Sequence, residues 1–458
     1  MTISLDEGPI GRIAHRLRVD HTTAAHRRPA SAPAPGRRGA GSRWSESHGA
    51  SEQEEGRQIA GDRSGLSVGA ARRRDERWPS RAKAVVLGLL PPLLTFAGAR
   101  LFLWVVIDAP PARLDAQTWA RWDSGQYDSI AQHGYNLNTC ASLGAPDLGT
   151  YCGNAAWHPL LPVLMRAVGV FGLSTMRAGI LVSQVAFAAV LVVVWVGFLD
   201  RRVTKRNVGL LVLAGFFFGG VYYFAVFPLS LFVLLVLLWA LAFSHGRWIL
   251  GGVAALLAVL AYPLGVVLVP VGAVWVLLGT RGEPPGHRAL VAGASSLLAA
   301  SGLLVVFAVH QVTIGRWDAS LEQQRTSFRA GPMNPLTNWI DVVVRRSTWT
   351  QVASSRAATV LAVQTAVVAV VVLTALVVVV RDRGRSTTDI GVALLVAALW
   401  LVPLSNDIAS GLYRRESTIL PVVLLLRRAP TVVVWAFAVA AVALFGPLAR
   451  LFQLSLVM

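Results

Sequence analysis

Long uninterrupted apolar segments are the feature that most restricts how this chain can fold. The segment VLAVQTAVVAVVVLTALVVVV spans residues 360–380 without a charged side chain. As a helix, about 20 such residues cross the roughly 30 Å of hydrocarbon in a bilayer. Only 14% of the 458 residues are charged, against about 25% in soluble domains, and 54% are hydrophobic. No segment alternates polar and apolar residues as a barrel strand does. The sequence therefore predicts an all-α, polytopic transmembrane helical bundle.

Apolar segments recur along the chain and give about 11 candidate spans. They are the ranges 84–107, 176–199, 208–224, 229–243, 249–262, 264–278, 289–310, 357–380, 388–404, 412–426 and 431–451. Pro228 and the Tyr262-Pro263 pair interrupt two of these regions. Broken helices at membrane depth are tolerated only where they line a cavity or are buried in protein. The number of spans therefore stays open.

Basic residues gather in alternate short connections between the candidate spans. These connections are residues 200–207, 244–248, 280–288, 381–385 and the pair 427–428. The positive-inside rule places them in the cytoplasm and the C-terminus outside. Two longer segments, about 108–175 and 311–356, then lie on the extracytoplasmic side. Segments of that length are usually functional or disordered, and we expect function to lie between these two.

Residues 1–83 differ from the rest of the chain. They hold 16 Lys/Arg and 10 Asp/Glu, and the segment SAPAPGRRGAGSRWSESHGASEQEEGR has no apolar periodicity. This composition predicts a disordered basic cytoplasmic tail ahead of a membrane domain at 84–458. The tail lacks the apolar core of a signal peptide. The net charge of +18 is spread over the tail and the short connections rather than one face. We therefore expect membrane lipids around the protein and no nucleic-acid partner.

The two cysteines of the chain, Cys140 and Cys152, both fall in the first extracytoplasmic segment. Outside the cytoplasm such a pair favours a disulfide, with two unpaired thiols as the alternative. Two thiols without histidine partners make a poor zinc site. The sequence also shows no carboxylate cluster suited to a divalent cation. We expect neither a metal nor a cofactor.

The same segment begins with ARWDSGQYDSIAQHGY, residues 120–135, an unusual concentration of polar side chains. Read as a helix, it places Asp123, Tyr127 and Ile130 along one face. Asp128 lies about 140° around the helix from Asp123, given about 3.6 residues per turn. The two acids are therefore not expected to form the paired carboxylates of a glycoside hydrolase.

Asp123 has two interpretations from spacing alone. Followed by Gln126, it fits a loose capping box at the start of an amphipathic interfacial helix. Trp119, Trp122 and Tyr127 would then be ordinary interfacial aromatics. Alternatively, Asp123 is a general base at the membrane surface, where a hydroxyl acceptor meets a lipid-borne donor. Only 14 acidic residues follow residue 83, which favours a specific use for this one.

The stretch RWDSGQYDSIAQHGY resembles the first-loop signature of the PIG-V-type mannosyltransferases and their bacterial relatives, roughly R-W-D-x-x-x-Y-x-x-I-A-x-x-G-Y. The matches are Arg121, Trp122, Asp123, Tyr127, Ile130, Ala131, Gly134 and Tyr135. Less specific similarities follow in order at residues 155–166, 224–235, 260–270 and 411–426. The resemblance implies a type C glycosyltransferase fold and a sugar donor carried on a polyprenyl phosphate.

The chain departs from the family pattern at three places. Pro228-Leu229 stands where the family has a Ser-Glu pair, which leaves Ser230 alone. Tyr262 replaces an arginine before Pro263, and His158 replaces an aromatic residue. These changes remove an acid and a base, and they put specificity in question.

The resemblance implies an inverting transfer of a sugar, mannose in the family, to an extracytoplasmic lipid, glycan or protein hydroxyl. Asp123 would be the catalytic base, and arginine would suit the phosphate. The residues expected to bind substrate are Arg121, Trp122, Tyr127, His158, Arg414 and Arg415, with His133, Arg316, Arg325 and Arg329 as further candidates. Two alternatives are a transporter or flippase of lipid-linked precursors and an inactive scaffold. Transporters place ionisable groups at mid-membrane, whereas acids here cluster in the outer segments.

Overall fold

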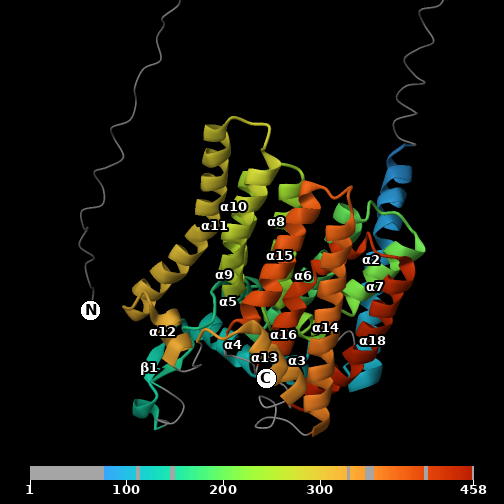
Figure 1. The fold of residues 1–458 in the computed structure, drawn as a ribbon. Helices are drawn as coiled ribbons and strands as arrows, with labels where there is room; N and C mark the ends of the chain where they lie inside the picture. The colour runs from blue at the N-terminus through green and yellow to red at the C-terminus, as the bar shows by residue number, and fades with distance from the viewer. Residues whose placement is uncertain are drawn as a thin grey trace, which may run out of the picture. The chain divides into compact units, whose positions relative to one another are not determined.

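The computed structural model describes residues 77–109, 114–144, 150–326, 331–345, 355–406 and 411–455. These residues are mostly helical (Figure 1). Six of the described helices are long and apolar enough to cross a membrane, which supports a membrane-embedded protein. They contain the segments Gly88–Ile107, Thr175–Phe198, Pro285–Ile314, Ala357–Arg381, Thr387–Leu404 and Thr431–Gln453.

The long helices are α2 (Arg77–Ile107), α6 (Thr175–Val193), α11 (Pro285–Ile314), α14 (Ser355–Arg381), α15 (Thr387–Leu404) and α18 (Thr431–Gln453). Shorter apolar helices pack among them: α5 (Leu160–Gly169), α7 (Lys205–Gly215), α8 (Leu229–Ser244), α9 (Trp248–Ala261) and α10 (Leu268–Gly279). Hydrogen bonds from short polar side chains cap the first turn of several helices, as in α15, where Ser386 and Asp389 form a capping box. The tail expected at residues 1–83 lies outside the described residues as far as residue 76, and α2 begins at Arg77.

The remaining elements are short. The short α-helices are α3 (Ala116–Trp119), α4 (Asp123–His133), α12 (Ala319–Thr326), α13 (Pro335–Ile340), α16 (Leu412–Arg415) and α17 (Val422–Leu426), and the strands are β1 (Leu137–Thr139) and β2 (Tyr151–Gly153). The 3₁₀-helical turns are η1 (Ala141–Leu143), η4 (Gly220–Tyr223), η5 (Pro263–Val267) and η8 (Glu416–Ile419). The π-helical turns are η3 (Val194–Phe198) and η6 (Asp341–Arg345). The strands pair antiparallel, with Asn138 opposite Cys152. In Figure 1, α3, α4, α12, α13 and this hairpin lie at the lower end.

Two of the predicted spans are not continuous helices. Residues 208–224 hold only α7 and η4, because the helix stops at Gly215 and Gly219 takes a left-handed turn with φ +71°. Residues 412–426 are divided into α16, η8 and α17, with Pro421 at the second break. Both irregular stretches are almost wholly buried. Their unpaired backbone groups can therefore be satisfied by protein at membrane depth.

Residues 216–228, here called the buried loop, include the end of the first irregular stretch. They contact the second irregular stretch and the segment that leads into the polar motif at residues 120–135. The Tyr222 hydroxyl lies 3.4 Å from that of Tyr413, and the Tyr223 hydroxyl donates to the Ser417 carbonyl. At its other end, the Val226 amide donates to the Trp119 carbonyl over 3.2 Å. The buried loop thus joins the segment before α4 to the segment that contains α16.

Candidate active site

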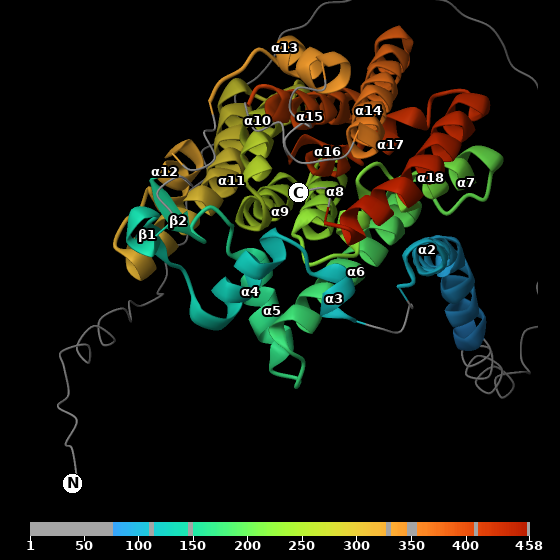
Figure 2. The same cartoon turned by 90° about the horizontal axis from the view of Figure 1, so that it is seen from below.

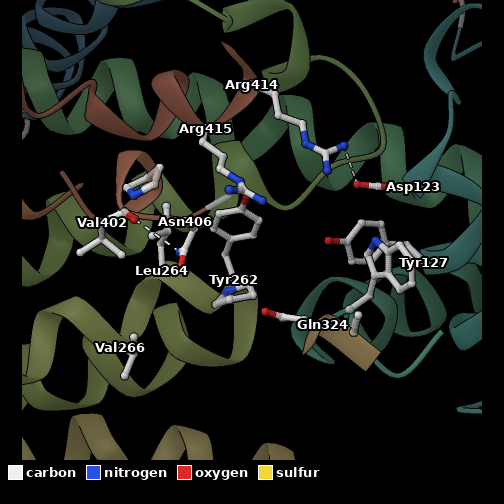
Figure 3. Close-up of a pocket in the computed structure, with 14 residues that line it drawn as sticks. Asp123, Tyr127, Tyr262, Leu264, Val266, Gln324, Val402, Asn406, Arg414 and Arg415 are labelled. Atoms are coloured by element: carbon white, nitrogen blue, oxygen red, sulfur yellow. Dashed lines mark hydrogen bonds and ion pairs between the residues drawn. The ribbon is translucent and has the colours of Figure 1, made fainter. Parts of the chain in front are cut away.

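A cavity of about 280 Å³ lies where these parts of the chain meet (Figure 3). Its lining comes from α4, the loop after β2, the α9–η5 junction, α12, the end of α15 and α16. The lining residues are Asp123, Tyr127, Ala156, Trp157, Tyr262, Pro263, Leu264, Val266, Gln324, Val402, Pro403, Asn406, Arg414 and Arg415. The cavity therefore unites both long segments between the spans with the late Tyr-Arg-Arg sequence.

Asp123 is the first residue of α4, and its carboxylate faces the cavity. Trp122 rather than Asp123 occupies the N-cap position, so the capping interpretation of Asp123 is wrong. Trp122 has a φ of +46°, a conformation that is costly for a bulky side chain. Such strain is characteristic of functional positions. Asp123 Oδ2 instead lies 2.7 Å from Nη1 of Arg414.

The buried loop contacts Arg414 and Ser124, the residue next to Asp123. Ser124, next to Asp123, donates from its hydroxyl to the Val226 carbonyl over 3.1 Å. The Arg414 guanidinium lies 5.9 Å from the ring centre of Phe227, a cation–π distance. Because one buried segment contacts Arg414 and the neighbour of Asp123, the spacing of the two charged groups is fixed by the protein core.

Arg415 is the second guanidinium of the cavity. Its side chain lies beside that of Tyr262 (Figure 3), which closes α9 in extended backbone just before Pro263. A residue before proline is driven toward this conformation, which turns the tyrosine away from the helix. Figure 3 shows the two side chains together across the cavity from Asp123. Tyr262, which in the sequence indicated the loss of an arginine from the site, thus lies beside another arginine, Arg415.

Tyr127 lies one helical turn after Asp123 and is 3% exposed. Burial, together with the neighbouring Asp123 charge, raises the pKa of its phenol well above 10. Tyr127 therefore stays neutral and contributes a hydroxyl that can donate or accept. Asp128 points elsewhere, as helical geometry predicts, and accepts from Gln132 over 2.7 Å and from Thr175.

Three of the residues expected to bind substrate do not line the cavity. Arg121 donates to the carbonyls of Ala120 and Gln453, and Trp122 packs on the hydrophobic core. His158 is buried, and its Nδ1 donates to the Val259 carbonyl. Burial lowers the pKa of His158 to about 4, so the ring is neutral.

Of the further candidates, His133, Arg316 and Arg325 also lie outside the cavity lining. His133 and Arg325 are exposed, and Arg329 lies outside the described residues. Arg316 pairs with Asp318 over 2.7 Å and donates to the Tyr151 hydroxyl over 2.9 Å. The hydrogen bond from Arg316 holds the pKa of Asp318 below its usual range. Arg316 thus joins the two long segments rather than facing the cavity.

Cys140 and Cys152 are joined by a disulfide that closes the β1–β2 hairpin. In the described part of the chain, no group of three or more His, Cys, Asp or Glu side chains could hold a metal ion. Sequence reasoning missed Trp157, Tyr262, Gln324 and Asn406 as lining residues. Only Trp157 and Tyr262 had a signal, because Tyr262 directly precedes Pro263 and Trp157 lies two residues before Pro159.

A second, wholly apolar groove adjoins the cavity. Val259, Val266, Val267, Val269, Pro270, Ala299, Ala300, Leu303 and Val402 line its volume of about 390 Å³. Val266 and Val402 line both hollows. The cavity that holds the charged groups is therefore next to an apolar groove between α9, α10, α11 and α15.

Comparison with known proteins adds no relative: no known family matches this chain, and no curated protein does.

Proposed function

We propose that this protein is a membrane glycosyltransferase. It transfers a sugar, mannose by the resemblance of its motif, from a polyprenyl-phosphate carrier to a hydroxyl acceptor on the extracytoplasmic side. The observation that carries the proposal is the cavity in which Asp123, Arg414 and Arg415 converge beside an apolar groove. A substrate with a charged head and a long apolar tail fits this combination.

The charges of the cavity favour a donor with a single phosphate. The described lining residues include one carboxylate and two guanidinium groups, a formal charge of +1. A phosphodiester-linked sugar carries one negative charge and would balance it, whereas a diphosphate would leave an excess. Arg414 has five N–H donors and uses Nη1 for Asp123. The same guanidinium can therefore hold the base and contact the phosphate.

The chemistry follows from these positions. Asp123 accepts the proton of the acceptor hydroxyl while the hydroxyl oxygen attacks the anomeric carbon. The bond between that carbon and the phosphate oxygen breaks, and the phosphate leaves with the electron pair beside Arg414 and Arg415. A single displacement inverts the anomeric centre. The polyprenyl phosphate needs no proton to leave, so one carboxylate suffices.

The test is Asp123→Asn in membranes supplied with polyprenyl-phosphate mannose and an envelope lipid extract as the acceptor source. Because a general base contributes about 10²–10⁴ in rate, transfer should fall by at least about a hundredfold at normal expression. Asp128→Asn, on the same helix but facing Thr175 and Gln132, is the matched control and should keep activity. Unchanged transfer by Asp123→Asn would refute the assignment.

A further inference from the structure

The cavity has two chemically different sides around Asp123. One side holds Arg415 and Tyr262, and it borders the apolar groove at Val266 and Val402, which line both hollows. The other side is built by the two long segments between spans. It consists of Tyr127, Ala156, Trp157 and Gln324, with no charged side chain among the described residues that line it.

Gln324 reaches the cavity because α12 is fixed to the disulfide hairpin. Its neighbour Gln323 is 2% exposed and uses both ends of its carboxamide. Nε2 donates to the Gly153 carbonyl over 2.9 Å, and Oε1 accepts from the Ala156 amide over 2.8 Å. These two bonds attach α12 to the chain directly after Cys152, and Ala156 itself lines the cavity.

A second attachment lies on the other side of the disulfide residue. Arg316, just before α12, donates to the Tyr151 hydroxyl and lies 5.0 Å from that ring centre. The residues before and after Cys152 in the sequence are therefore both bonded to α12 or to the residues just before it. Two adjacent glutamines have different positions: Gln323 is an internal anchor, and Gln324 faces the cavity, as Figure 3 shows.

We propose that Tyr127, Trp157 and Gln324 form the acceptor subsite, that its ligand is an uncharged, hydroxyl-rich group such as a sugar ring, and that Gln323 is the positioning residue for Gln324. This inference rests on the proposed function. With the phosphate side assigned to the donor, the acceptor oxygen must approach Asp123 from the opposite side. That side is the wall carried by α12 and the hairpin.

The side chains of this wall match such an acceptor. The Gln324 carboxamide donates and accepts, as hydroxyl groups require, and the neutral Tyr127 phenol does the same. The Trp157 indole offers an apolar face against which a sugar ring can pack. A charged acceptor would enter without a counter-ion and would be disfavoured by desolvation.

The experiment uses the full chain in lipid nanodiscs, with polyprenyl-phosphate mannose as donor and octyl mannoside as acceptor probe. Gln324→Ala should raise the KM for octyl mannoside roughly tenfold, because a buried hydroxyl loses its partner. The donor KM and the slow hydrolysis of donor by water should stay within about twofold. Leu321→Ala, an exposed position on the same helix, is the control and should change neither.

A double-mutant cycle tests the positioning role of Gln323. If Gln323 acts through Gln324, Gln323→Ala should raise the acceptor KM in the parent but add little in the Gln324→Ala background. Fully additive effects, or an unchanged acceptor KM in Gln324→Ala, would overturn the inference. So would donor hydrolysis without transfer to the mannoside. If one of these three results is found while Asp123→Asn still abolishes donor turnover, only the acceptor subsite is refuted and the proposed function stands. Donor turnover that survives Asp123→Asn refutes the acceptor subsite and the proposed function together.

Discussion

At the scale of single residues, Tyr262 lies beside Arg415, and we expect it to hold the position of that charge. Tyr262→Phe keeps the ring and removes the hydroxyl, the one polar group that this side chain presents beside Arg415. We expect the KM for polyprenyl-phosphate mannose to rise several-fold with kcat nearly unchanged, because a phosphate contact is loosened while Asp123 is untouched. Steady-state kinetics at saturating acceptor measure this. Arg415→Lys should have a larger effect, since it also loses the planar fork, and a KM unchanged in both variants would contradict the role.

His158 gives a prediction in pH. Burial lowers its pKa to about 4 from about 6.5, partly offset by the bond to the Val259 carbonyl and reinforced by the nearby His310. The unfolded chain therefore binds a proton on this ring at a higher pH than the folded chain does. The stability due to neutral His158 is complete above about pH 6.5 and is lost as the pH falls through about 4. The loss can reach about 3 kcal/mol.

Thermal unfolding of the protein in detergent between pH 7 and pH 4 measures this effect. His158→Gln keeps a donor for the Val259 carbonyl and removes the titration. The melting temperature of the variant should fall less than that of the parent between pH 7 and pH 4. Equal pH dependence in both proteins would show that His158 is not the titrating group.

Single residues were only partly predictable from the sequence. The motif identified Asp123 and Tyr127 because their spacing is local, on one helical face. Arg414 and Arg415 were chosen for their chemistry, and both line the cavity. Gln324 carries no local signal, because its position depends on contacts of Gln323 with residues about 170 positions earlier. Tyr262 was interpreted as a loss because its partner, Arg415, is distant in the sequence.

At the scale of elements, the buried loop determines the geometry of the site. Its turn at Gly219 has a φ of +71°, and a Cβ there would lie 2.8 Å from the Tyr413 carbonyl oxygen. Gly219→Ala should therefore combine backbone strain of about 1–2 kcal/mol with a clash next to Arg414. We expect a lower melting temperature and a transfer rate reduced by at least about tenfold, since displacement of a reacting group is costly.

Gly98→Ala is the matched control for this substitution. Gly98 lies in α2 with no atom within 4 Å of an added Cβ, so alanine should be neutral or slightly stabilising in the helix. Normal activity in Gly219→Ala would show that the buried loop does not set the position of Arg414.

Element boundaries followed the sequence where helices are long and apolar, and failed where the chain is buried but irregular. Hydrophobicity measures burial, and residues 216–228 are as apolar as a helix without forming one. The interruption at Pro228 was visible, and the turn at Gly219 was not. Asn154, Arg316 and Gln323 lock the hairpin and α12 through side-chain bonds that no periodicity predicts.

At the scale of the whole membrane domain, the basic connections and the polar motif are separated by the long helices. Arg427 and Arg428 pair with Asp389 over 2.8 and 2.6 Å, and Arg428 also pairs with Asp382. This cluster ties the α14–α15 turn to the α17–α18 turn. Figure 2 views the opposite end, where α4 and α5 lie side by side near α3. The helical membrane class was predictable from composition, whereas the count of 11 spans stays a prediction, since six of the described helices are long and apolar enough to span and shorter apolar helices lie among them.

The orientation of this domain can be tested because both native cysteines are joined in a disulfide, which leaves the thiol of an added cysteine as the reactive one. Leu321→Cys places a thiol on the exposed face of α12, at the end that holds the cavity. Gly282→Cys places one in the basic connection between α10 and α11, where a Cβ meets no atom within 4 Å. By the positive-inside rule, a membrane-impermeant maleimide should label Leu321→Cys in intact cells and Gly282→Cys only after the membrane is opened. The reverse pattern would place Asp123 in the cytoplasm, where a donor presented on the outer leaflet cannot reach it, and would exclude the proposed reaction.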